Sequence, residues 1–256
     1  LVAVAARPAA LLFAVLLAGI VALLLASTLL TPLSNDAGTY LTIADGLRHG
    51  QLPYRDLFDH KAPGIYITFA ATLAASERSL YAVQGVQMLA ILATALLLSD
   101  LARRRWGTLA AAVSVLLTLY GSIAYEGAHL TTELWVACAN AAALWTLLAR
   151  PNHTHTKWHW LSAGLWVGLA GLYKQTGLLL LPVLLLWSWS LRSSRRDRWL
   201  HITLLIGGCL LPWLIVVVWF LMLGGWPDFW RDVVWLNLTH YPRAAWSSLL
   251  RGHIVN

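Results

Sequence analysis

Charged residues are scarce in this sequence. Of its 256 residues, 11% are Asp, Glu, Lys or Arg, whereas 59% are hydrophobic and the mean hydropathy is +0.66. A soluble domain carries roughly 25% charged residues, so this composition favours an integral membrane protein. Uncharged runs agree: residues 8–35, 79–99, 106–125 and 199–227 each reach the roughly 20 residues that span a bilayer.

Cysteine is also nearly absent. Cys138 and Cys209 are the two cysteines, and each lies within an apolar run. Isolated thiols in such surroundings are typical of small core residues and provide neither a disulfide framework nor a metal-ligand pattern. The net charge of +7 would suit a nucleic acid. However, the cations lie beside apolar runs, where membrane topology accounts for them, so we expect no nucleic-acid partner.

What is present is an array of apolar segments. Three shorter runs cover residues 134–149, 158–173 and 175–191, near the lower limit of about 17 residues for a span. We therefore predict an all-α polytopic membrane protein with about seven transmembrane helices in a single domain, residues 1–256. Because the sequence begins with Leu and stops just after a polar stretch, a fragment of a longer protein is one expectation.

The distribution of Lys and Arg predicts the orientation. If Arg7 is cytoplasmic, alternation of the spans places residues 103–105, 150–157 and 192–198 on the same side. With Arg7 and Asp100 included, that side has ten cations and two acids. Eight of the 18 cations and nine of the 11 acids remain for the other face. The positive-inside rule favours this arrangement, which puts the polar loop at residues 32–78 outside. The simplest setting is a bacterial plasma (inner) membrane.

The outer loop begins with a helical pattern. From Tyr40, apolar residues recur at i, i+3, i+4 and i+7, and the apolar stretch 63–76 is too short to span, so we expect interfacial or re-entrant helices. One interpretation makes Ser34 or Asp36 an N-cap. The other makes Asp36 a general base whose pKa is raised by partial desolvation at the membrane edge.

Cations and acids alternate further along this loop. Lys61, as a point charge, and Arg55, as a bidentate donor, would suit a phosphate group. The alternative is a solvated loop with local ion pairs to Asp56 and Asp59. Asp59 with His60 would offer a divalent metal two adjacent ligands, which is a weak signal, so we predict no metal site and no cofactor, with metal binding kept as an alternative.

Charge also occurs at two later outer positions. Glu126, His129 and Glu133 precede the fourth span; acids at a membrane edge are functional candidates, and ordinary span-end polarity is the alternative. Lys174 separates two runs of about 16 residues, or roughly 24 Å of helix, less than the ~30 Å bilayer core. A short hairpin facing a polar cavity would hold Lys174 against an anionic headgroup or phosphate, whereas a snorkelling lysine is the alternative.

Several short motifs are similar to those of a known family. They are Asn35-Asp36, the PYRD and HKAPG motifs at residues 53–56 and 60–64, and GLYKQTG at residues 171–177. They resemble the GT-C glycosyltransferases, specifically the protein O-mannosyltransferase and aminoarabinose-transferase-like group. This resemblance implies a GT-C-like domain with its catalytic acid at Asp36 and a lysine against a lipid phosphate at Lys61, and it adds Tyr54 and Gln175 to the substrate-binding residues.

Together these observations predict a membrane glycosyltransferase. The resemblance implies a polyprenyl-phosphate sugar as donor, in contact with membrane lipid, and an acceptor that the sequence does not identify. Transfer is expected to invert the sugar, with Asp36 as base and cations on the phosphate, whose last pKa near 6 makes a general acid unnecessary. A transporter or flippase for lipid-linked sugars is the alternative, although we find no internal repeat of the kind common in transporters. A non-catalytic membrane scaffold is the third class.

Overall fold

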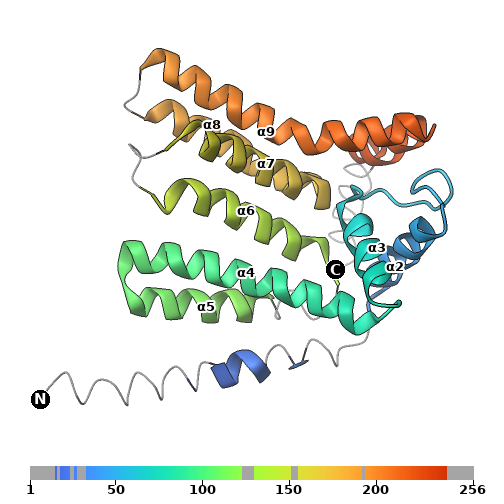
Figure 1. Ribbon diagram of the computed structural model, residues 1–256, viewed down its shortest axis with the longest axis horizontal. Coiled ribbons are helices and arrows are strands. Elements are labelled where there is room, and N and C mark those ends of the chain that lie inside the picture. The colour runs from blue at the N-terminus through green and yellow to red at the C-terminus, as the bar shows by residue number, and fades with distance from the viewer. Residues whose placement is uncertain are drawn as a thin grey trace, which may run out of the picture.

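The computed structural model describes residues 33–122, 130–150, 155–191 and 194–240, with short pieces between residues 15 and 27 (Figure 1). Within these residues every regular element is a helix, and one isolated bridge joins Pro53 to Leu57. The predicted all-α class is therefore confirmed for the described part of the chain.

The longer helices lie side by side in a row (Figure 1). Across the row they are α5 (Thr108–Ser122), α4 (Leu80–Trp106), α6 (Thr132–Leu148), α7 (Lys157–Tyr173) with α8 (Leu180–Ser190), and α9 (Arg195–Met222). Two helices from the predicted outer loop, α2 (Asn35–Arg48) and α3 (Gly64–Ala75), sit together where the helices of the row end on the right of Figure 1. Short elements complete it: η3 (Gln175–Leu179), α10 (Trp226–Phe229), the π-helical turn η4 (Trp230–Trp235) and α11 (Leu236–Thr239).

Two described helices, α4 and α9, are long and apolar enough to cross a membrane, with 27 and 28 residues. The helices α3, α5, α6 and the stretch Gln175–Ser190 are apolar but have 10–17 residues. The prediction of about seven spans is therefore not confirmed. The first predicted span, residues 9–30, lies mostly outside the described residues. The predicted break in the short hairpin does occur, because α7 ends at Tyr173 and a 3-10 turn follows Lys174.

Serine side chains cap the N-termini of α2 and α4. The hydroxyl of Ser34 accepts a hydrogen bond from Ala37 N at 3.2 Å, so Ser34 is the N-cap of α2 and Asp36 lies inside its first turn. Ser79 caps α4 in the same way. This satisfies an otherwise unpaired backbone N–H and leaves the Asp36 carboxylate available for other partners.

Glycines allow α7 and α9 to pack closely. A Cβ atom at Gly164 would lie 2.2 Å from the Leu205 carbonyl oxygen, and one at Gly208 would lie 2.2 Å from the Leu161 carbonyl oxygen. Only glycine permits this approach, which is common between helices in membranes. These contacts hold the middle of α7 against the first half of α9.

The turns with the cations gather at the other ends of these helices, away from α2 and α3 (Figure 1). There Asp100 of α4 accepts hydrogen bonds from Arg103, Arg104 and the Trp145 indole of α6. The described cations of the predicted inner side thus share one end of the molecule, and the polar loop occupies the other. Which end faces the cytoplasm stays a prediction.

Candidate functional site

A cavity of about 660 Å³ lies beside α2, where the helices of the row end near the outer loop. Its walls come from the outer loop, the start of α6, the break after α7, α9 and the segment that follows α9. The lining residues are Asp36, His60, Lys61, Glu133, Lys174, Gln175, Thr176, Leu178, Trp213, Val233, Val234, Asn237 and Leu238. The structure thus brings together three segments that the sequence analysis singled out separately.

Asp36 and Lys61 form an ion pair on one wall of the cavity. The Lys61 ammonium lies 2.5 Å from Oδ2 of Asp36, with the Asp36 side chain 65% exposed and the Lys61 side chain 15% exposed. One turn along α2, the Tyr40 hydroxyl donates to the same Oδ2 at 3.2 Å and accepts a hydrogen bond from Lys61. The carboxylate is therefore held by two donors and remains open to solvent.

These contacts affect the pKa values of the Asp36 carboxyl and the Tyr40 hydroxyl. The hydrogen bond from Lys61 lowers the pKa of Asp36 below its ordinary value of 3.8, while partial burial opposes that shift. Partial burial thus acts in the predicted direction, but the predicted rise in the pKa does not occur in the unliganded site, because the ammonium outweighs the burial. Burial, followed by the nearby Asp36 carboxylate, raises the pKa of Tyr40 far above 10.0, so Tyr40 stays a neutral donor.

A second acid–lysine pair lines the same cavity. Glu133, in the first turn of α6, binds the ammonium of Lys174, the C-cap residue of α7. The Glu133 side chain is 59% exposed and that of Lys174 is 34% exposed. Both predicted cavity cations are thus neutralised by carboxylates, and an anion that attracts either ammonium would leave a carboxylate without its partner.

Asp59 is buried and does not line the cavity. Its Oδ2 accepts a hydrogen bond from the Tyr66 hydroxyl at 2.6 Å, and its Oδ1 accepts one from the His60 backbone at 2.6 Å. Burial favours a higher pKa for Asp59, but the hydrogen bonds from His60 and Tyr66 prevail and lower it. Asp59 therefore shapes the turn that presents Lys61. The described residues contain no cluster of three or more side chains suited to holding a metal ion.

Tyr54 and Arg55 lie outside the cavity, although we predicted that both bind substrate. Tyr54 is buried, and its hydroxyl donates to the Lys61 carbonyl oxygen at 2.7 Å, so it supports that residue from behind. Arg55 makes a two-pronged pair with Asp56, at 3.0 and 2.9 Å, and reaches the Leu223 carbonyl oxygen. The hydrogen bond from Arg55 lowers the pKa of Asp56 to about 2. Arg55 thus joins the loop to the end of α9.

The sequence analysis missed the wall that follows α9. Val233, Asn237 and Leu238 belong to a Trp-rich stretch that alternation of the spans puts on the outer face. Because this stretch has no clear period, no pattern indicated that these side chains line a cavity with the outer loop. Glu126 and His129 lie outside the described residues. Gln175 does line the cavity, but its side-chain amide donates to the Val233 carbonyl oxygen at 3.2 Å.

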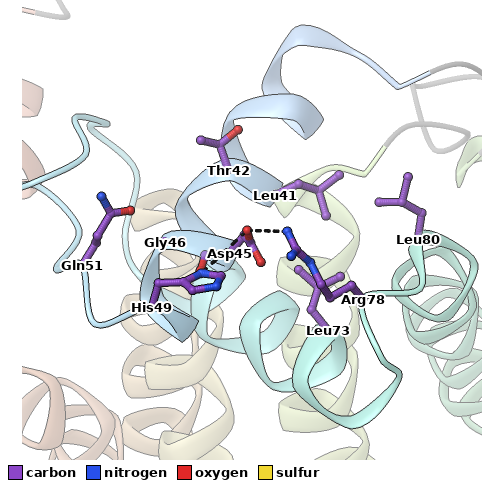
Figure 2. Close-up of a pocket in the computed structure, with 9 residues that line it drawn as sticks. All are labelled: Leu41, Thr42, Asp45, Gly46, His49, Gln51, Leu73, Arg78 and Leu80. Carbon is purple, nitrogen blue, oxygen red and sulfur yellow. Dashed lines mark hydrogen bonds and ion pairs between the residues drawn. The ribbon is translucent and has the colours of Figure 1, made fainter.

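A second cavity, of about 600 Å³, lies beside α2 near its C-terminal end (Figure 2). Asp45 is nine residues beyond Asp36, about two and a half turns, so it faces the opposite side of the helix. Figure 2 shows Asp45 joined to Arg78, with Nη2 and Oδ2 2.8 Å apart, and Arg48 also binds Asp45, at 2.9 Å. The pair with Arg78 fastens α2 to the turn between α3 and α4, whereas Arg48 pairs with Asp45 within α2.

Comparison with known proteins adds the family. Residues 60–220 match the family model described as dolichyl-phosphate-mannose-protein mannosyltransferase. No curated protein and no solved structure matches the chain. The match covers more than half of the chain and includes Lys61, Glu133 and Lys174, whereas Asp36 precedes it. The chain therefore belongs to the dolichyl-phosphate-mannose-protein mannosyltransferase family, a group of GT-C membrane glycosyltransferases.

Proposed function

We propose that the cavity transfers a sugar from a polyprenyl-phosphate donor to an acceptor hydroxyl or amine at the outer membrane face. The family supports a glycosyltransferase and implies a lipid-phosphate donor. The observation that carries the proposal is the meeting of Asp36, Lys61 and Lys174 in one cavity. A carboxylate beside two ammonium groups suits a reaction that removes one proton and releases one phosphate.

The reaction is a single displacement. The acceptor oxygen or nitrogen forms a bond to the anomeric carbon while the bond from that carbon to the phosphate oxygen breaks. The electron pair of the broken bond leaves with the phosphate, and Asp36 takes the acceptor proton. Because the acceptor attacks the anomeric carbon on the face opposite the phosphate, the configuration inverts. A phosphate monoester with a last pKa near 6 leaves without protonation. Lys61 and Lys174 supply the positive charge that its developing charge requires.

Donor binding would also prepare the base. In the unliganded site Lys61 holds the Asp36 carboxylate and lowers its pKa. When Lys61 turns to the donor phosphate, Asp36 loses its strongest partner while its partial burial remains, so its pKa rises and it becomes a better base. If Lys174 also turns to the phosphate, Glu133 loses its partner in the same way.

The apolar part of the cavity suits the lipid end of the donor. Leu178, Trp213 and Leu238 line it beside the charged groups, and the Leu238 side chain is 74% exposed at its edge. The first isoprene units would lie there, with the rest of the chain in the bilayer. This arrangement requires a polytopic protein, as proposed from the sequence, with the cavity at the outer leaflet of a plasma membrane.

The test uses proteoliposomes that contain the purified chain, polyprenyl-phosphate mannose labelled in the sugar, and a membrane extract as the source of acceptor. We expect the label to leave the lipid and polyprenyl phosphate to accumulate. Intact labelled lipid that only changes leaflet would instead indicate a flippase. Intact lipid that stays in place would contradict both activities.

A further inference from the structure

The segment after α9 contains a π-helical turn whose carbonyl groups bind side chains. A π-helix closes with i→i+5 hydrogen bonds, is rare, and often occurs at functional sites. Here the Asn237 side-chain nitrogen donates to the carbonyl oxygens of Asp232 at 3.2 Å and Val233 at 3.1 Å. Val233 also accepts the hydrogen bond from Gln175. The turn is therefore a meeting point for side chains from two segments.

Both hydrogen bonds involve a residue next to a cavity lysine in the sequence. Asn237 donates to the carbonyl oxygen of His60 at 2.7 Å, immediately before Lys61. Gln175 directly follows Lys174 and is held by Val233 at 3.2 Å. Through Asn237 and Gln175, the π-helical turn is thus hydrogen-bonded to the chain next to each of the two lysines.

We propose that Asn237 is a positioning residue, which with Gln175 clamps the two lysine-bearing segments at a fixed spacing. The spacing serves one phosphate group, a role that rests on the proposed function. Asn237 lies beyond residues 60–220, so the matched region of the family does not include it. The proposal also gives Gln175 a positioning role in place of the direct phosphate contact expected from the sequence.

The chemistry of the contacts fixes the orientation of the Asn237 amide. Three carbonyl oxygens surround its nitrogen. Carbonyl oxygens accept only, so the group facing them has to be the NH₂ end of the amide. An aspartate of the same shape would put a carboxylate oxygen against these acceptors and push the segments apart. Asn237→Asp should therefore disturb the spacing of the two lysine-bearing segments more than Asn237→Ala does. A role in packing alone predicts the larger disturbance for Asn237→Ala.

The test measures the lysines directly in the purified protein. The sequence has three lysines, Lys61, Lys157 and Lys174. Lys157 begins α7 at the end of that helix away from the cavity. Trace labelling with acetic anhydride, read by mass spectrometry, gives the reactivity of the two cavity lysines relative to Lys157. We expect the relative labelling of Lys61 to rise in Asn237→Ala and to rise further in Asn237→Asp.

Matched variants separate the clamp from general damage. Thr239→Ala is two residues away, where the hydroxyl bonds locally to Trp235 and His240. It also removes the Asn-Leu-Thr glycosylation sequon at Asn237, so it controls for a role of Asn237 as a glycosylation site. It should leave all three reactivities unchanged. Gln175→Ala should raise the labelling of Lys174 and provides an independent reading if the Asn237 variants do not fold.

The transfer assay then distinguishes this inference from the proposed function. If Asn237 acts through Lys61, the double variant Asn237→Ala with Lys61→Ala loses no more activity than Lys61→Ala alone. Unchanged lysine labelling in the Asn237 and Gln175 variants would overturn the clamp, whatever the activity. Full transfer by Lys61→Ala would overturn the proposed role of that lysine, while the labelling result still decides the clamp.

Discussion

The Lys61 ammonium contacts Asp36 across 25 residues of chain, with Nζ and Oδ2 2.5 Å apart. The proposed base and the proposed phosphate ligand therefore bind each other before any donor arrives. The pair keeps Asp36 ionised and Lys61 directed into the cavity. It also makes the strength of the base depend on whether a phosphate has taken the lysine.

The first prediction concerns Lys61→Met. The hydrogen bond from Lys61 lowers the pKa of Asp36, so its removal leaves burial as the main influence and raises that pKa. The acid limb of kcat/KM, which reports the free enzyme, should move to higher pH. The measurement is the pH profile of residual transfer. Lys157→Met, at the far end of the molecule, should leave the limb in place, and an unmoved limb in Lys61→Met would refute the coupling.

The second prediction compares two profiles of the unaltered protein. The pH dependence of kcat reports the donor-bound state, in which Lys61 has turned to the phosphate. Asp36 should then titrate at higher pH than in the free enzyme, so the acid limb of kcat should lie above that of kcat/KM. Coincident limbs at saturating and limiting donor would show that Lys61 stays on Asp36.

The third prediction concerns Asp59→Asn. An amide at this position can accept from the Tyr66 hydroxyl or the His60 backbone, but its NH₂ end then opposes the other donor. The loss should be about 1–3 kcal/mol of unfolding free energy near neutral pH. Because the folded-state pKa of Asp59 is lowered, its contribution is present above the unfolded pKa and is lost as pH falls through the folded pKa.

Denaturant unfolding of the detergent-solubilised protein measures this difference at several pH values. The gap between Asp59→Asn and the unaltered chain should narrow in acid. A gap that widens in acid would mean that Asp59 is protonated in the folded protein, contrary to its hydrogen bonds.

The fourth prediction tests the packing of α7 against α9. Gly208→Ala places a methyl group 2.2 Å from the Leu161 carbonyl oxygen, whereas the same change at Gly207 meets nothing within 4 Å. Overpacking typically costs about 1–3 kcal/mol. The unfolding midpoint should therefore fall for Gly208→Ala and hold for Gly207→Ala. Equal midpoints would indicate that the two helices separate easily.

The sequence was sufficient for much of the fold because hydropathy and capping are local. Ser34 begins α2, apolar runs become α4 and α9, and the break after α7 falls at Lys174. Alternation of the helices placed the outer loop and Lys174 on the same face, but only the folded chain shows that they line one cavity. The two close glycines of α7, Gly164 and Gly168, form a small-residue pattern that we did not use, although it indicated tight helix packing.

Other features depend on contacts that no local pattern reveals. Arg55 is taken up by its neighbour Asp56 and the end of α9, so it does not reach the cavity. The low pKa of Asp36 requires Lys61, which approaches it only in the folded chain. Asn237 lies in a stretch without hydrophobic periodicity, and its contacts with the carbonyl oxygens of His60, Asp232 and Val233 exist only in the folded chain.

The most direct test of the proposed chemistry compares two carboxylates of the same helix. Asp36→Asn removes the proposed base, whereas Asp45→Asn alters an acid on the opposite side of α2 that binds Arg48 and Arg78. With labelled polyprenyl-phosphate mannose in proteoliposomes, Asp36→Asn should slow transfer by about 10²–10⁴-fold, the usual contribution of a general base. Asp45→Asn should retain most of its activity. Undiminished transfer by Asp36→Asn would contradict the assignment of Asp36 as the catalytic base.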